Sequence, residues 1–414
     1  MIFTRRNFLS ATARVTGGIA LSRGFLGRSS FAEEQSILVG SLHDYSGPIA
    51  SSGQQGVAAL TIAIDELNAA GGLLGRPLKL VHYDTQSSIQ LYSQYAQQLA
   101  LSDKVAVVHG GITSASREAV RPVFDRYRTL YFYNTLYEGG VCDRNTFCTG
   151  TTPGQTVQKL VPSALKRAGG GKAYIIAADY NYGQITAKWM AKYCQDSGGE
   201  ILTTEFFPLD VTNFGPTISK IQERKPDIVL SALVGANHVG FYRQWAAAGM
   251  NGRIPIASTT FGLVNEPKTL EAHESNGLLG SYGYFEELDT PRNAAFVSAL
   301  KAKFGDDIPY ISEIGAATYE AMHLWAMAVK QAGTVEREKV IEALETGIAF
   351  DGPSGKVVVD KQTHHTTRNA YLAEVQEKRW VVAERYENQS PSDTAAVCDL
   401  VKNPNDNQQY VIGL

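Results

Sequence analysis

Short apolar runs alternate along this chain with longer segments whose apolar positions recur every three or four residues. Residues 105–108 form one such run, and its β-branched side chains between turn residues are typical of a strand buried on both faces of a parallel sheet. Residues 55–70 show the helical period, with Leu60 and Ile64 on one apolar stripe. Gly71-Gly72 follows directly, and glycine commonly ends a helix.

This alternation continues from residue 37 to residue 257. The pattern predicts strands at residues 37–41, 78–83, 105–108, 129–133, 173–177, 205–208, 228–232 and 254–257. It predicts helices at residues 55–70, 88–102, 117–126, 155–168, 182–198, 214–223 and 238–248. Strands and helices at this βαβ spacing predict mostly parallel sheets with right-handed connections. Residues 131–150, rich in Tyr, Thr, Asn and Gly, are interpreted as a structured loop.

From residue 278 the order of elements changes. A strand is predicted at residues 278–284, and helices follow at 293–304, 311–332 and 337–346. A turn at residues 352–355 precedes strands at 356–359, 369–375 and 380–386. Residues 388–414 are polar and contain Pro391 and Pro404, so we expect a C-terminal tail with little order of its own.

The first residues have the order of an export signal. Arg5 and Arg6 precede a mildly apolar region at residues 15–21, and Ser30 and Ala32 supply the small residues that suit cleavage after Ala32. This arrangement resembles a twin-arginine signal peptide at residues 1–32, which exports a folded protein to the periplasm. No later apolar run has the length of a membrane span, so no direct membrane insertion is expected.

Composition and charge add two exclusions. Hydrophobic residues make up 44% and charged residues 19% of the 414 residues, the balance of a globular protein with room for two or three domains. The net charge of −3 gives no electrostatic reason to expect nucleic acid as a partner. The motifs G-x-S-x-G and H-E-x-x-H are absent, so the serine-hydrolase and zinc-hydrolase templates are not met.

Four cysteines follow the signal, and they can form disulfides in an oxidising compartment. Cys142 and Cys148 enclose a short loop and are the first expected pair. The second expected pair, Cys194 with Cys398, would tie the tail to the rest of the protein. A zinc site is the alternative, but the chain has no CxxC motif, and we expect no metal.

A hydroxyl-rich helix start follows the strand at residues 105–108. The chain turns through Gly110-Gly111 and then reaches Thr113 and Ser114. Such hydroxyls cap the first N–H groups of a helix, and the same N–H groups attract polar or negative groups. Open α/β sheets bind ligands at this end of their strands. From these residues alone, a plain helix cap and a ligand contact both remain open.

Several segments resemble one family. Residues 63–78 combine an acidic helix end with the pattern N-x-x-GG-x-x-G-R-P. Further similar segments are residues 133–139 (Y-x-T-P-Y-E-G in the family), 178–183 (S-D-Y-x-Y-P), and 231–235 with Tyr242-Arg243 (V-V-G and F/Y-Y-R). Over residues 37–386 the chain is thus similar to the type I periplasmic binding proteins, in the branch that binds branched-chain amino acids, amides and urea.

The resemblance implies an α/β fold of two Rossmann-like lobes with mostly parallel sheets, joined by a three-crossing hinge. Lobe one would comprise residues 33–152 and 284–348, lobe two residues 153–283 and 349–387, and the polar tail residues 388–414. Such proteins bind a solute between the lobes and close around it by hinge motion.

The resemblance also places ligand-binding candidates at strand ends in both lobes. They are Thr113, Ser114, Tyr133, Thr135, Tyr137, Glu138 and Tyr45 in lobe one, and Asp179, Tyr182, Gly235 and Thr260 in lobe two. The hydroxyls of the helix start would hold a carboxylate or carbonyl oxygen, and the tyrosines would add flat apolar faces. Glu138 would bind an amide or ammonium, or it would brace Arg144 or cap a turn. Asp179 would face the solute or cap the next helix.

Three departures from the family pattern leave the solute open. Leu136 and Gly183 stand where the branch has proline, and Ile112 stands where its amidase-linked sensor has tyrosine. The expected function is an extracytoplasmic solute-binding protein that delivers urea, a short-chain amide or a related small polar solute to the permease subunits of an ABC uptake transporter. No cofactor or catalysis is expected. The alternatives are an amino-acid-binding protein for branched-chain or other amino acids, a ligand sensor, and a periplasmic hydrolase.

Overall fold

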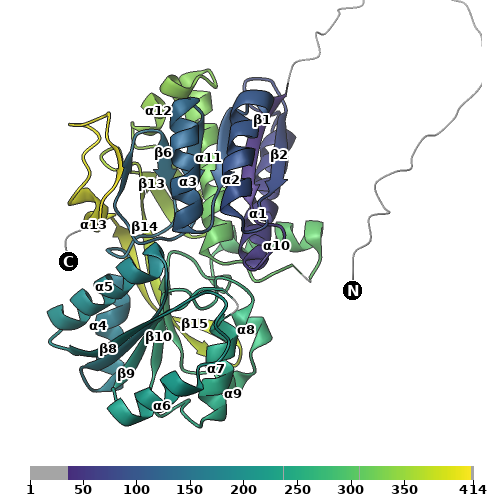
Figure 1. Ribbon diagram of the computed structural model, residues 1–414. Helices are drawn as coiled ribbons and strands as arrows, with labels where there is room; N and C mark the ends of the chain where they lie inside the picture. Colours follow the sequence, from purple (N-terminus) through teal and green to yellow (C-terminus); the bar gives the residue numbers. More distant parts are fainter. Residues whose placement is uncertain (1–35, 236, 307, 412–414) are drawn as a thin grey trace, which may run out of the picture. The chain divides into compact units, whose positions relative to one another are not determined.

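The computed structural model describes residues 36–235, 237–306 and 308–411. The signal peptide expected at residues 1–32 lies outside the described residues. Within the described part of the chain, no helix combines the length and the apolar character needed to cross a membrane. Strands and helices alternate over most of this span (Figure 1).

Residues 37–148 contribute a five-stranded sheet. Its strands are β1 (Ile37–His43), β2 (Leu78–Asp84), β3 (Val107–Gly110), β4 (Leu130–Tyr133) and β6 (Thr146–Cys148). The spatial order is β2-β1-β3-β4-β6, and every neighbouring pair is parallel. All residues of β3 are buried, because this strand lies at the centre of the sheet, as its apolar run predicts.

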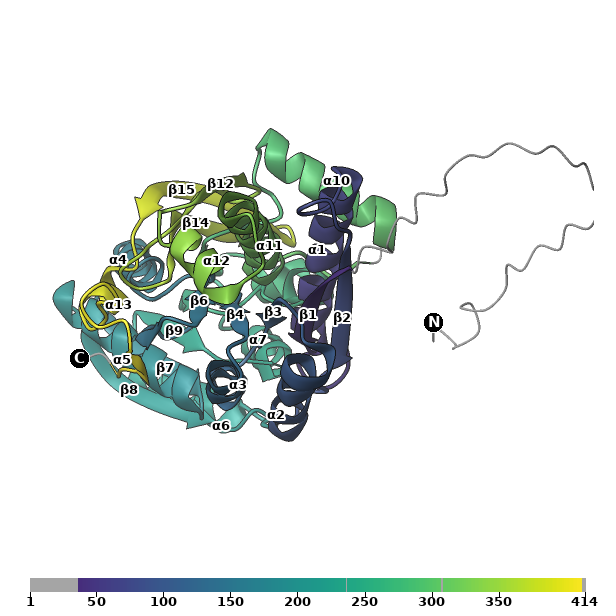
Figure 2. The ribbon, with the colours of Figure 1, turned by 90° about the horizontal axis from the view of Figure 1, so that it is seen from above.

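Helices cover both faces of this first sheet. They are α1 (Ala50–Ala69), α2 (Ile89–Gln97), α3 (Ser114–Arg126), α11 (Glu313–Ala332) and α12 (Arg337–Leu344), and α10 (Pro291–Phe304) packs against α1. A π-helical turn at Gln98–Asp103 extends α2. Figure 2 shows α2 and α3 on one face of the sheet and α1, α11 and α12 on the other. α11 is buried over most of its length because it packs against both α1 and α12.

The second sheet contains most of the remaining strands. They are β7 (Lys172–Ala178), β8 (Glu200–Phe207), β9 (Ile228–Ala232), β10 (Ile256–Ser258), β11 (Leu279–Tyr282), β12 (Ala349–Gly352), β13 (Gly355–Val359), β14 (Thr366–Gln376) and β15 (Arg379–Gln389). Strands β8-β7-β9-β10-β11 pair in parallel, and β11 then pairs antiparallel with β14. The predicted α/β class with mostly parallel sheets is confirmed.

The chain moves between the two sheets three times. It leaves the first sheet after β6, returns to it after β11 with α10 and α11, and joins the second sheet again at β12. The residue limits of the two lobes stay a prediction. The helices of the middle segment are α4 (Val157–Ala168), α5 (Asn181–Asp196), α6 (Gly215–Arg224), α7 (Asn237–Ala247), α8 (Glu266–Thr269) and α9 (Ala272–Ser275).

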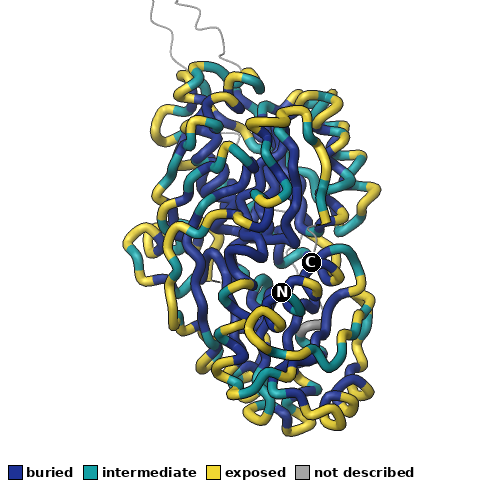
Figure 3. Tube along the Cα trace, turned by 90° about the vertical axis from the view of Figure 1, so that its left-hand side faces the viewer, coloured by how far each residue is buried: buried dark blue, intermediate teal, exposed yellow. Residues whose placement is uncertain are grey.

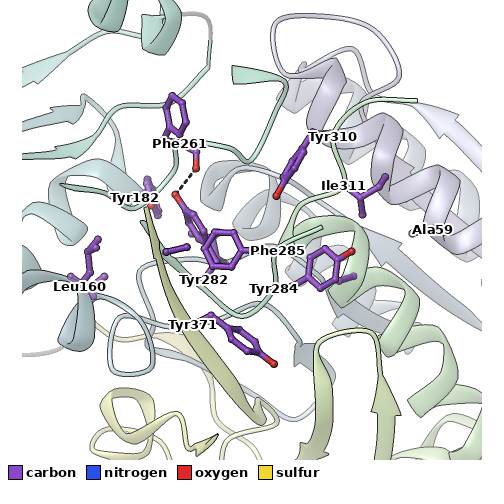
Figure 4. Close-up of a cluster of buried hydrophobic side chains, with 14 of the residues drawn as sticks. Ala59, Leu160, Tyr182, Phe261, Tyr282, Tyr284, Phe285, Tyr310, Ile311 and Tyr371 are labelled. Atoms are coloured by element: carbon purple, nitrogen blue, oxygen red, sulfur yellow. Dashed lines mark hydrogen bonds between the residues drawn. The ribbon is translucent and has the colours of Figure 1, made fainter. Parts of the chain in front are cut away.

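The central strands of both sheets are buried, and exposure is concentrated on helices, loops and the outer strands β8 and β15 (Figure 3). An aromatic cluster fills the core beside β11 (Figure 4). The Tyr282 hydroxyl donates to the Phe261 carbonyl at 2.7 Å, and the Tyr282 ring meets Phe285 and Trp380 edge-on. These contacts fix the loop that follows β10, which carries part of the candidate site described below.

Two segments have more order than the sequence predicts. The segment at residues 131–150 contains β5 (Val141–Asp143) as well as β6, so it is not only a loop. The C-terminal tail contains α13 (Ser392–Ala395) and β16 (Asn407–Gln409), and β16 pairs antiparallel with β5. The tail obtains its order from contacts with the rest of the protein, which its polar composition does not reveal.

The expected disulfide pairs differ from the structure. Cys142 is bonded to Cys398, while Cys148 and Cys194 are free and buried. Cys142 lies in a small cluster with Cys398 and Leu400, whereas Cys148 packs among the tyrosines of the first sheet. The two cysteines that are close in sequence therefore face different parts of the interior.

Candidate functional site

A pocket lies at the carboxyl ends of strands from both sheets, the edge at which open α/β sheets usually bind ligands. Its empty space, counted together with the open solvent at its mouth, is about 540 Å³. Its lining residues are Ile49, Ser52, Ile112, Thr113, Ser114, Tyr133, Thr135, Leu136, Tyr180, Tyr182, Val234, Gly235, Thr260, Leu263, Val264, Glu266 and Ile314.

The start of α3 forms one wall of the pocket. Thr113 is the N-cap, and its hydroxyl accepts the Ser116 N–H at 3.1 Å, so the helix begins at Ser114, earlier than predicted. The turn before it requires glycine, because Gly110 has a φ of +133° and a Cβ there would meet the Leu42 carbonyl oxygen at 2.2 Å. The turn thus brings the first N–H groups of α3 to the pocket.

An apolar wall faces this helix start. Ile49, Ile112 and Ile314 form a buried cluster with Leu263 packed against it, and all four residues line the pocket. They come from the segment before α1, the β3–α3 turn, α11 and the loop after β10. Ile112, which replaces the tyrosine of the related sensor, therefore contributes apolar surface here.

The predicted residues Tyr133 and Thr135 line the pocket and shape the neighbouring turn. The Tyr133 hydroxyl donates to the Ile112 carbonyl at 2.9 Å, and the Thr135 hydroxyl donates to the Gly111 carbonyl at 3.0 Å. Both protons are therefore used by the β3–α3 turn. The Tyr133 ring is left to supply a flat apolar surface.

Three predicted residues line the pocket from the second sheet. Tyr182 on α5 shares a hydrogen bond with the Thr259 hydroxyl at 3.0 Å. Thr260 donates to the Leu233 carbonyl at 2.6 Å. Gly235, with a φ of +78°, makes the turn that follows β9. The pocket thus brings Tyr182, Thr260 and Gly235 together with Thr113, Ser114, Tyr133 and Thr135.

Glu266 is the one carboxylate among the described lining residues. Its Oε2 accepts the N–H groups of Gly262 and Val264, each at 3.1 Å. Burial raises the pKa of Glu266 to about 7, although these hydrogen bonds act in the opposite direction. The carboxyl group therefore changes its charge near neutral pH.

Three other predicted residues lie outside the lining. Tyr45 is 55% exposed, and Asp179 is exposed and accepts the Gln184 side-chain amide at 2.9 Å. Tyr137 is buried and shares a hydrogen bond with His365 Nε2 at 2.5 Å. Any contact between these residues and a solute stays a prediction.

Glu138 also lies outside the lining, buried behind the start of α3. It accepts hydrogen bonds from the Ser114 hydroxyl, from Arg117 Nη2 at 3.0 Å and from the Gln409 side-chain amide. The expected brace to Arg144 is wrong, because Arg144 pairs with glutamates on and after α12. Although burial opposes it, the Glu138 carboxylate helps to hold the pKa of Arg117 above its usual range.

Sequence reasoning missed much of the apolar lining. The lining residues that it did not propose are Ile49, Ser52, Ile112, Leu136, Tyr180, Val234, Leu263, Val264, Glu266 and Ile314. An aliphatic residue that lines a site has the same sequence signature as one in the core. Tyr180 could have been proposed from the sequence, because it lies in the segment at residues 178–183 that resembles the family.

Comparisons with known proteins identify the family of this chain. A family profile described as "Periplasmic binding protein" matches residues 36–379. The chain is 24% identical over 355 residues to the Leu/Ile/Val-binding protein homolog 6 of Brucella melitensis biotype 1, covering 84% of this chain and 89% of that protein. It is 25% identical over 360 residues to the Leu/Ile/Val-binding protein homolog 7 of Brucella abortus (strain 2308), covering 80% and 90%.

Solved structures share the fold. The solute binding protein of an ABC transporter from Rhodopseudomonas palustris BisB5, in complex with 3,4-dihydroxy benzoic acid, superposes with a TM-score of 0.78 at 20% identity, covering 86% of this chain and 98% of that one. LivJ from Streptococcus pneumoniae, in complex with isoleucine, gives 0.75 at 20% identity, covering 85% and 100%. The chain therefore belongs to the periplasmic binding protein family, with the type I architecture that these solved structures share.

Proposed function

We propose that this protein captures a small carboxylate with an apolar body outside the cytoplasm and delivers it to the permease subunits of an ABC uptake transporter. One observation carries the proposal: the pocket sets the start of α3 beside a wall of aliphatic and aromatic side chains. Because the family consists of binding proteins, we propose binding without turnover. Mass spectrometry of the released solute tests this point, since a changed mass would refute it.

The carboxylate would lie at the N-terminus of α3. The first N–H groups of a helix and its dipole attract a negative group, and Thr113 and Ser114 place this helix start at the pocket. No Lys or Arg belongs to the described lining. The helix start is therefore the main attraction that the pocket offers to an anion.

The apolar wall favours a solute with a hydrophobic body. Covering Ile49, Ile112 and Ile314 is worth roughly 25 cal/mol for each Å² of apolar surface removed from water. Urea and acetamide have little apolar surface to offer, so the pocket supports the first sequence-based expectation less well. The ligands of two structural neighbours support a solute with an apolar body, since one neighbour was solved with 3,4-dihydroxy benzoic acid and another with isoleucine.

An amino acid with an apolar side chain is the second candidate, because Glu266 lines the pocket. An ammonium group placed beside this carboxyl would favour its ionised form and would pair with it. The names of the curated relatives support the same class. The two candidates share the carboxylate and the apolar body, and they differ in the need for Glu266.

A ligand panel tests the proposal. The mature protein is titrated calorimetrically with benzoate, 4-hydroxybenzoate, L-isoleucine, L-leucine, urea and acetamide, and its thermal unfolding is followed with each compound. A compound present at 100 times its Kd should stabilise the folded state by roughly 2.7 kcal/mol. We expect stabilisation by aromatic carboxylates or apolar amino acids. Stabilisation by urea or acetamide alone would refute the proposed solute class.

The twin-arginine route is a separate proposal about the first residues. Replacing Arg5 and Arg6 with lysine should block transport through a pathway that requires the arginine pair. Cell fractionation measures the result, with a change of Arg14 to lysine as the matched control. Unchanged export of the double variant would contradict the twin-arginine route and leave solute binding untouched.

A further inference from the structure

The C-terminal segment, residues 390–411, contacts the back of the solute pocket. It lies outside the residues that match the family profile, which end at residue 379. Figure 1 draws this segment in yellow, and its strand β16 pairs with β5 in the register Gln409 to Val141. The disulfide Cys142–Cys398 ties the segment to β5 a second time.

Gln409 reaches a carboxylate that also holds a pocket residue. Its side-chain amide donates to Oε1 of Glu138, which accepts Arg117 Nη2 at 3.0 Å as well. Oε2 of Glu138 accepts the hydroxyl of Ser114. Ser114 is the first residue of α3 and lines the pocket. A single buried carboxylate therefore joins the C-terminal segment to the proposed anion-binding end of the site.

The same segment is hydrogen-bonded to the connection by which the chain first passes from one sheet to the other. The Asp393 carboxylate accepts the Thr152 hydroxyl at 2.7 Å and the Gly154 N–H at 3.0 Å. Gly140 donates its N–H to the Thr394 hydroxyl at 3.1 Å. Residues 149–156 connect β6 to α4. The segment therefore contacts one of the connections about which the lobes would move, and it is linked to the pocket residue Ser114 through Glu138.

We propose that the C-terminal segment is a positioning element of the solute site, with Gln409 as its positioning residue. The inference rests on the proposed binding of a carboxylate. Glu138 is a buried carboxylate close to the proposed binding site for the solute carboxylate. Each hydrogen bond that Glu138 accepts therefore weakens the repulsion between the two carboxylates. Gln409 also fixes the carboxylate whose other oxygen orients the Ser114 hydroxyl. Without this amide, α3 would stay helical, but the Ser114 hydroxyl and the first N–H groups of the helix would no longer be held in the orientation that binds the solute.

Gln409→Ala and Gln409→Glu test the proposal, with Gln408→Ala as the matched control. Gln408 lies on the same strand and is exposed, so its removal leaves the β16–β5 pairing in place. Losing one hydrogen bond to a charged group should weaken the Kd of 4-hydroxybenzoate, or of L-isoleucine, by roughly five- to tenfold. Gln409→Glu should weaken it further, because two carboxylates would then face each other.

A second measurement does not need a solute. Hydrogen exchange of the peptide covering residues 112–120 should be faster in Gln409→Ala than in the wild type or in Gln408→Ala. The double variant Cys142→Ser/Cys398→Ser, which removes the other attachment, should change exchange and Kd in the same direction. Each Gln409 variant should still unfold in one cooperative transition well above the temperature of the binding and exchange measurements, so that weaker binding or faster exchange reports on a folded protein.

The outcomes separate the two proposals. The positioning role would be overturned if both Gln409 variants kept the wild-type Kd and exchange rate. It would also be overturned if Gln408→Ala weakened binding and sped up exchange to the same extent. In both cases the proposed function stands. If the wild type binds no compound of the panel, while hydrogen exchange is still faster in Gln409→Ala, the proposed function would be overturned. In that case the contact between the segment and α3 would be upheld without a solute.

Discussion

Glu266 should make solute binding depend on pH in a way that distinguishes the two proposed solute classes. Burial raises the pKa of this carboxyl to about 7, and the residue lines the pocket. A solute that carries only a carboxylate adds a negative charge, so it binds best when Glu266 is protonated. An amino acid whose ammonium pairs with Glu266 binds best when Glu266 is ionised.

The size of the effect follows from the pKa. With a value of about 7, the protonated fraction is about 0.9 at pH 6 and about 0.1 at pH 8. If only the protonated form binds the carboxylate, the apparent Kd weakens about tenfold over this range, which equals about 1.4 kcal/mol. An amino acid paired with the ionised form should instead gain about tenfold in affinity between pH 6 and pH 8.

Isothermal titration at pH 6, 7 and 8 measures this dependence for the wild type and for Glu266→Gln. Glutamine keeps an oxygen that can accept the Gly262 and Val264 N–H groups, and it does not titrate. The variant should bind carboxylates with a Kd that is independent of pH, and it should bind amino acids weakly at every pH. A wild-type Kd without pH dependence, or the same slope in the variant, would refute the role assigned to Glu266.

Three further predictions concern the apolar wall, acid stability and a buried ion pair. Ile112→Asn should weaken solute binding roughly tenfold, because it places an unpaired amide in the wall, while Ile112→Val stays within about twofold by calorimetry. Burial lowers the pKa of His43 and of His109 from 6.5 to about 3, so the unfolded state binds more protons between these values. The free energy of unfolding should therefore fall by roughly 1.4 kcal/mol per pH unit for each histidine as the pH drops through this window. Urea unfolding at pH 7 and at pH 5 measures this loss. Equal free energies of unfolding at the two pH values would contradict the prediction. Arg368→Met should cost roughly 3–5 kcal/mol in urea unfolding, because it leaves the buried Glu320 without its cation, and replacing Glu320 as well should recover most of the loss.

Local patterns were sufficient to predict most of the fold. Residues 228–232 form a predicted strand that coincides with β9, because a short apolar run between turns has few alternatives in an α/β chain. The start of α3 was placed too late, because Ser114, Ala115 and Ser116 show no apolar periodicity, although the turn at Gly110-Gly111 and the capping hydroxyls were recognised. β5 was missed because its three residues have no periodicity, and its partner β16 lies more than 250 residues further along the chain.

The candidate site could be predicted in position and only partly in composition. Strand ends indicated Thr113 and Thr260, because parallel strands present their carboxyl ends at one edge of a sheet. The family resemblance also selected Glu138, which lies outside the described lining and pairs with Arg117 and not with Arg144. Its partners Arg117 and Gln409 come from distant parts of the chain, and no local pattern shows whether a carboxylate faces a solute or another side chain.

The use of the hydroxyl protons is the reason why we propose a solute with an apolar body and not the small polar solute that the sequence suggested. Tyr133, Thr135 and Thr260 are polar residues in the sequence, but each donates its proton to a backbone carbonyl. Ser114 donates its proton to Glu138. At this wall the first N–H groups of α3 and the Thr113 hydroxyl, which acts only as an acceptor from Ser116, remain to bind a solute. Donors at this wall, beside aliphatic side chains, suit a molecule with one anionic end and an apolar body, whereas urea needs partners on every side.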